Sequence, residues 1–166
     1  MAYSDFTSSR STVAALDTDA MFSTFLMEAC TRIHALGYFY RTGPKIREEQ
    51  AIQCPSCIVI PRSIDIIETQ LSGMRFQNDY ILDIGFALKG SNDCILLQQA
   101  LYYEQIIRKS FAKGDDGAAI LTFDSIPEHF NTKILTTTIE PVELLTNDVL
   151  AFSSGINIAF STWESY

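Results

Sequence analysis

The side chains with the most obvious potential for chemistry are two closely spaced cysteines. Cys54 and Cys57 form a C-x-x-C pair, a spacing used by zinc sites and by thiol redox centres. A structural zinc site needs four ligands, normally from a second close pair, whereas Cys30 and Cys94 are isolated within apolar-periodic segments. The redox motif normally opens a helix, but Cys57 leads into the strand-like run 58–60. The pattern therefore favours packed thiols over a metal or redox site.

The two histidines offer few ways to build a catalytic site. A nucleophile needs a positioned base, and only His34 and His129 are present. His129 lies in the predicted turn 127–130, and no G-x-S-x-G elbow accompanies it. The segment 114–117 carries two adjacent acids where a phosphate loop needs N–H groups and positive charge. We therefore expect no enzyme, no cofactor and no metal.

The chain is acidic, with 12 basic and 20 acidic residues and a formal net charge of -8. Proteins that bind nucleic acid gain affinity by neutralising phosphates, so binding DNA is not the expected main role. The charge suits solubility, and it also suits a surface along which DNA passes without sticking. No run of about 18 apolar residues predicts a membrane span, and residues 1–10 lack a secretory pattern. We expect use in a cytoplasm, or in a particle assembled there.

Two amphipathic helices are expected to hold the core together. Apolar residues recur at spacings of three and four over 18–36 and over 93–112. Asp17 or Thr18 can cap the first helix and Gly37 can end it. The residues between this helix and the first strand, 38–53, are polar and predict a long connection.

Several strands are expected around these helices. They cover 56–60 (ended by Pro61), a hairpin of 63–70 with a strand from Arg75, then 80–88, 118–126, 132–140 and 154–163. The clearest is Tyr80–Leu88, whose even positions are all large and apolar, with Asp83 on the smaller face. The predicted fold class is α+β: a mixed, mostly antiparallel sheet flanked by two main helices in a single domain over 17–166, after a flexible arm at 1–16.

Four of these segments together resemble a known family. They are Ile58–Pro61, Tyr80–Phe86, the helix end Ile106–Lys109, and the late strand Ile156–Phe160. Over roughly residues 18 to 163 the chain looks like the tail terminator (tail completion, or tail-to-head joining) proteins of tailed bacteriophages. The segments 38–53 and 127–150 are longer than a minimal terminator needs.

The resemblance implies a virion protein without enzymatic activity. Six copies would form a ring that caps the tail tube, fixes tail length and contacts the head-side connector or stopper protein. Viral DNA would pass through the lumen without sequence-specific binding. Another neck component, such as a stopper or head-completion adaptor, is an alternative. A small-molecule-binding or enzymatic α/β domain is a second alternative, which a concave pocket lined by polar groups would favour.

A ring needs apolar surface that the monomer leaves unpaired. The candidates are Ile66, Ile67, Leu71, Met74 and Phe76 in the hairpin, and Val142, Leu144 and Leu145 in the late bend. The alternative for each of them is a place in the core of the monomer.

Overall fold

The computed structural model describes residues 20–44, 53–67, 75–114, 116–137, 140–146 and 149–165. In chain order the elements are α2 (Met21–Ala35), β1 (Arg41–Gly43), β2 (Ser56–Ile67), β3 (Arg75–Lys89), α3 (Asp93–Ala112), β4 (His129–Thr137), β5 (Glu140–Thr146) and β6 (Val149–Ser165). The strands form one sheet in the order β1-β2-β3-β6-β4, and β5 also pairs with β6. β1 and β2 are parallel, and the other described pairs are antiparallel. The predicted α+β class, in a single domain, is confirmed.

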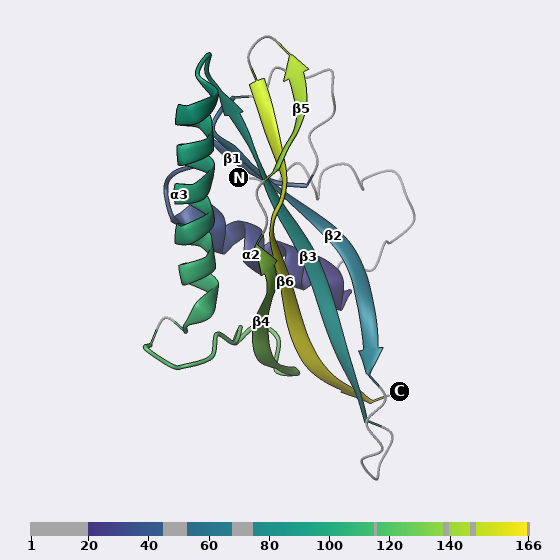
Figure 1. The fold of residues 1–166 in the computed structure, drawn as a ribbon. Coiled ribbons are helices and arrows are strands. Elements are labelled where there is room, and N and C mark those ends of the chain that lie inside the picture. The colour runs from purple at the N-terminus through teal and green to yellow at the C-terminus, as the bar shows by residue number, and fades with distance from the viewer. Residues whose placement is uncertain are drawn as a thin grey trace, which may run out of the picture.

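Both helices pack on the same face of this sheet, and they cross at a wide angle (Figure 1). Phe160 of β6 touches both of them. Its ring stacks on Phe25 of α2 with 4.8 Å between centroids, and it meets the ring of Phe111 of α3 edge-on at 6.1 Å. The even positions of β3 lie on this face, as their alternation predicts; they are Tyr80, Leu82, Ile84, Phe86 and Leu88, all buried. The core therefore lies between the two helices and the centre of the sheet.

Helix α3 has the predicted bounds. The side chain of Asn92 accepts two backbone hydrogen bonds from the first turn and so caps the helix. At the other end, the guanidinium of Arg32 donates to the carbonyls of Ser110 (2.8 Å) and Lys113 (3.3 Å). Carbonyls in the last turn of a helix lack a helical partner, so Arg32 ties α2 to the end of α3.

Two predicted boundaries in the first half of the chain are wrong. Helix α2 begins at Met21, three residues later than predicted, and Ala20 stands at its N-cap position without a side-chain hydrogen bond. Strand β2 continues through Pro61 to Ile67, although we predicted an end at Pro61. The register shifts there by a bulge, and an edge strand tolerates a residue without an N–H group. The predicted connection 38–53 also contains the short strand β1.

The strand predicted over 118–126 is absent, because side chains bind the backbone groups that a neighbouring strand would bind. The hydroxyl of Thr132 donates to the carbonyl of Leu121 at 2.9 Å. The N–H of Phe123 donates to Nδ1 of His129 at 3.1 Å. Leu121 and Phe123 are buried, so the burial pattern resembles that of a strand without its hydrogen bonds.

The last predicted strands also need correction. The strand predicted over 132–140 is two strands, because β4 ends at Thr137 and β5 begins at Glu140, and both pair with β6. Pro141, predicted to interrupt a strand, lies within β5. The final strand is longer than the predicted 154–163 at both ends.

The sheet is longer than the helices that cover it. Figure 1 shows β2, β3 and β6 continuing past α2 toward one narrow end of the molecule. We call this end the β-arm and define it as 63–67 of β2, 75–78 of β3 and 162–165 of β6. Within it Ile66 and Ile67 pair with Asn78 and Gln77, and 75–78 pair with 162–165, all in antiparallel register, while 63–65 lie opposite 79–81.

Candidate functional site

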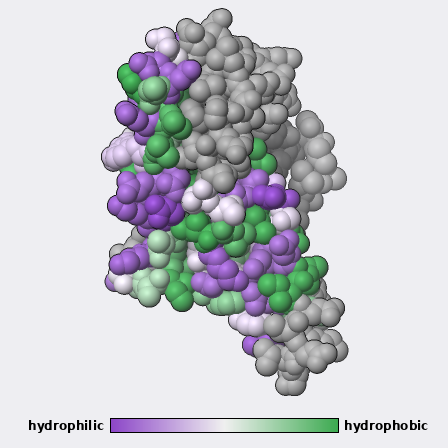
Figure 2. Space-filling view, viewed as in Figure 1, coloured by the Kyte–Doolittle hydropathy of each residue, from purple (hydrophilic) through white to green (hydrophobic). Residues whose placement is uncertain are grey.

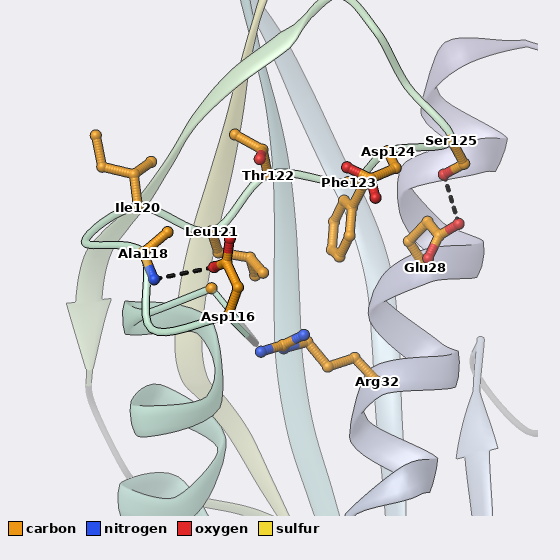
Figure 3. A pocket seen from close by; sticks show the side chains of 11 residues that line it. Glu28, Arg32, Asp116, Ala118, Ile120, Leu121, Thr122, Phe123, Asp124 and Ser125 are labelled. Carbon is orange, nitrogen blue, oxygen red and sulfur yellow. Dashed lines mark hydrogen bonds between the residues drawn. The ribbon is translucent and has the colours of Figure 1, made fainter.

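A pocket of about 400 Å³ lies between α2 and the segment that follows α3 (Figure 3). It is lined by Glu28, Arg32, Gly114, Asp116, Ala118, Ile120, Leu121, Thr122, Phe123, Asp124 and Ser125. Several of its polar groups already have partners within the chain. Glu28 accepts a hydrogen bond from Ser125 at 2.6 Å, and Asp116 accepts one from the backbone N–H of Ala118 at 2.9 Å. The guanidinium of Arg32 holds the end of α3 and lies 5.9 Å from the ring centroid of Phe111.

The lining of this pocket contains the carboxylates of Glu28, Asp116 and Asp124 and the hydroxyls of Thr122 and Ser125. Activation of a serine such as Ser125 usually needs a neighbouring base such as histidine or lysine. Neither type is among the lining residues.

His129, one of two candidate bases, is used to build the fold. It is buried and is the first residue of β4, whereas we predicted a turn. Its Nδ1 accepts from Phe123, so Nε2 carries the proton and lies 2.9 Å from the carbonyl oxygen of Asn131. Burial lowers the pKa of His129, and the hydrogen bond to Asn131 opposes this only in part. The neutral ring therefore links β4 to the segment before it by hydrogen bonds. His34, the other candidate base, is exposed.

The cysteines do not form a metal centre with other residues in the described ranges. Burial raises the pKa of the Cys30 thiol to about 12. Burial, helped by the neighbouring Cys30, also raises the pKa of Cys57 well above its ordinary value. Burial raises that of Cys54 as well. Among the described residues no group of three or more His, Cys, Asp or Glu side chains could hold a metal ion. Cys30 and Cys57 are buried, as expected for packed thiols, and protonated thiols are weak nucleophiles and weak ligands. Cys94, which we also expected to be packed, is exposed.

The face of the sheet opposite the helices carries a polar network. Asp83 accepts from Asn157 of β6 and lies 3.5 Å from the guanidinium of Arg62 of β2. The hydroxyl of Thr136 of β4 donates to Asn157 at 2.7 Å, so this cluster joins four strands. Asp83, which we predicted on the wet face as the one carboxylate of its strand segment, is thus held by partners from other strands.

A second cluster on that face centres on Asp79. Lys133 of β4 donates to its carboxylate at 3.2 Å, and Gln77 does so at the same distance. Burial alone would raise the pKa of Asp79, but Ser161, Gln77 and Lys133 outweigh it and lower the pKa. Lys133 therefore crosses over β6 to neutralise a charge on β3.

The predicted interface residues fall into three groups. Ile66 and Ile67 lie in the β-arm and are 63% and 39% exposed, and Phe76 lies in β3 of the same arm and is half-buried. Val142, Leu144 and Leu145 lie in β5, where the backbone alone is described. Leu71 and Met74 lie outside the described residues. The β-arm therefore brings together three of the eight predicted residues.

Sequence reasoning missed further exposed apolar residues on the edge strands. Ile60 and Ile64 of β2 are 42% and 46% exposed, and Leu135 of β4 is 47% exposed. Figure 2 shows hydrophobic surface beside the described end of β2. The run Ser-Ile-Asp-Ile-Ile at 63–67 is the signal that could have marked this edge, because it has apolar residues on both faces of one strand.

No protein-family model matches this chain, and no curated protein is significantly similar to it in sequence. None of the helices in the described ranges is long and apolar enough to cross a membrane.

Proposed function

We propose that this protein is a non-catalytic structural subunit that assembles with copies of itself. The observation that carries the proposal is the apolar edge of the β-arm, where Ile64, Ile66 and Ile67 are exposed next to one another along β2. Edge strands of soluble proteins are normally protected by charges, proline or bulges, because an open apolar edge recruits other chains. Here Pro61, the bulge at Arg62 and the charge of Asp65 protect β2 only in part, and the exposed isoleucines beside them fit a surface that is covered on assembly.

The specific form of the proposal is a ring subunit, of six copies, at the neck of a tailed phage virion. Its support is the resemblance of the strand and helix pattern to tail terminator proteins, together with the α+β fold. The net charge of -8 is compatible with a lumen through which viral DNA slides without binding. The tail tube protein and the head-side connector or stopper would be its partners. A stopper or head-completion adaptor is the alternative within the same class.

A second candidate function is a small-molecule-binding domain, and the pocket in Figure 3 is the observation that favours it. Its volume falls within the range of about 300–1,000 Å³ that is usual for ligand sites. The hydrogen bonds of Glu28 and Asp116 within the chain leave fewer of its polar groups for a ligand. We therefore rank this candidate below the structural subunit.

The test is the mass of the purified protein by light scattering, with negative-stain images of the same sample. The proposal expects six-fold rings with an open centre, alone or after addition of tail tubes. A protein that remains monomeric and does not bind tail tubes would contradict it. Binding of a small metabolite that protects the pocket from hydrogen exchange would then favour the second candidate.

A further inference from the structure

The sheet has an open stretch at each of its two sides. On one side, β1 pairs only with the first three residues of β2, Ser56 to Ile58. Beyond them, no described strand pairs with the outer edge of β2. On the other side, β4 pairs with β6 along its inner edge, and no described strand lies along its outer edge. Each open stretch offers backbone N–H and C=O groups to a further strand.

The two open edges match each other in direction. β2 runs antiparallel to β3, β3 to β6, and β6 to β4, so β2 and β4 are themselves antiparallel. If a second copy extends the sheet beyond β2 with its own β4, the new pair is antiparallel, the arrangement of every neighbour of β3 and β6. Such head-to-tail contacts use two different surfaces, and a closed ring of them leaves neither of these two stretches open.

The bulge at Arg62 limits the usable part of β2. Pro61 has no N–H to donate, and the register shifts between Pro61 and Ser63. The segment 63–67 is free of proline and lysine, and its Ile64 and Ile66 are exposed. On β4, the exposed Leu135 is the apolar residue that such a contact would cover.

Charge favours the same pairing. Asp65 lies directly opposite Asp79, and like charges opposite each other destabilise a strand pair. Lys133 compensates Asp79, whereas Asp65 forms no ion pair with a described residue. Asp65 and Lys133 lie on the same face of the sheet, and the Lys133 side chain remains 37% exposed. Lys133 of a second copy docked on β2 would bring the missing positive charge beside Asp65.

We propose that the occupant of the β2 edge is a second copy of this chain, whose β4 (129–137) pairs antiparallel with 63–67 and sets its Lys133 beside Asp65. This inference rests on the proposed function, because it names the contact from which a ring of this protein is built.

Cysteine cross-linking in a Cys94→Ser background tests the contact directly, since Cys94 is the exposed free thiol of the described residues. Chains carrying Asp65→Cys are mixed with chains carrying Lys133→Cys and oxidised. We expect covalent dimers in the mixture, and at least about ten-fold fewer when Asp124→Cys, in an exposed loop, replaces Lys133→Cys. Equal yields from both mixtures would overturn the proposal.

Edge variants test the direction of the contact. The pair Ile64→Lys and Ile66→Lys blocks the β2 edge, and Leu135→Lys blocks the β4 edge, with circular dichroism to confirm folding. Each variant alone is expected to lose rings, whereas their mixture gives a one-to-one dimer and nothing larger. If the β2 variant loses its assembly but the β4 variant keeps it, the contact is a symmetric one between two β2 strands, and the inference is overturned. Rings that survive all three substitutions would overturn the inference but leave the proposed function standing. A wild-type chain that neither self-associates nor cross-links contradicts both.

Discussion

The helix-covered half of the sheet and the β-arm place apolar residues differently on the same face. Under the helices the central strands are apolar, as in Leu82 of β3 and Ile158 of β6, both fully buried. In the β-arm that face carries Asn78 and Thr162 at its centre, beside the half-buried Phe76, while Ile64 and Ile66 stand exposed on the outer strand β2. A face that is apolar at its centre can be covered by the chain's own helices. A face that is apolar at its edge needs a neighbour beside it, so the two halves differ in what can bury them.

The largest loss of stability is expected from a substitution in the core of the helix-covered half. Phe160→Ala removes a fully buried ring that contacts both helices, and large-to-small changes of this kind cost about 3–5 kcal/mol. The free energy of unfolding from urea titration measures this. Ile66→Ala in the β-arm should cost the monomer less than about 1 kcal/mol, because its side chain is mostly exposed. Equal losses from the two changes would contradict the difference between the two halves.

An intermediate loss of stability is expected when the hydrogen bonds by which Arg32 joins α2 to the end of α3 are removed. Arg32→Met keeps much of the length of the side chain but removes the hydrogen bonds to the carbonyls of Ser110 and Lys113. Loss of hydrogen bonds from a charged donor should cost about 1.5–3 kcal/mol, and hydrogen exchange in the last turn of α3 should quicken. Arg62→Met is the control, since its pair with Asp83 is longer and more exposed. A larger loss of stability from the control would contradict the role given to Arg32.

A smaller effect concerns pH. Burial lowers the pKa of His129 in the folded state, so the unfolded chain binds a proton more readily. Its contribution to stability is therefore fully present above the unfolded pKa, about 6.5, and is lost as pH falls through the lower folded value. Unfolding measured between neutral and mildly acidic pH should show this slope, and His129→Gln should flatten it.

The smallest change in the stability of the monomer is expected at Asp65, where a substitution also tests the proposed contact of the β-arm with a neighbouring copy. Asp65→Lys should leave the unfolding free energy within about 0.5 kcal/mol, because the residue is exposed. Self-association measured by sedimentation should weaken, because the new charge would face Lys133 of the neighbouring copy. Asp124→Lys makes the same change in net charge away from both edges and should associate as the wild type does. If both variants weaken association equally, the effect is one of net charge and not of contact.

Local signals made part of the fold predictable. The bounds of α3 follow from its cap at Asn92 and from a regular apolar stripe. Both signals depend only on residues that are close together in the sequence. The side of Tyr80–Leu88 that packs on the helices follows from the large apolar residues at its even positions, although Ile81 and Ala87 on the other face are buried as well. The segment 118–126 could not be assigned correctly, because its hydrogen bonds go to the side chains of His129 and Thr132, which only the tertiary structure brings close.

Local sequence signals also made part of the candidate assembly surface predictable. Ile66 and Ile67 are apolar residues of a predicted hairpin, and they are exposed in the structure. Asp65 and Lys133 were missed, because their relation depends on the strand order β2-β3-β6-β4 rather than on their sequence neighbours. The roles of Val142, Leu144 and Leu145 stay predictions, as do those of Leu71 and Met74.

The position of β6 in the sheet has a consequence for folding of the chain. β6 lies between β3 and β4 and also pairs with β5, yet a ribosome makes it after every other described element. The hairpin of β2 and β3 can close early, but the other side of β3 pairs with residues made much later, eighty positions further on in Tyr80↔Phe160. Pairings so distant in sequence form slowly, and an incomplete chain exposes the apolar side chains of β3 in the meantime. Expression at lower temperature, or in the presence of a chaperone that shields nascent strands, should therefore raise the yield of folded protein.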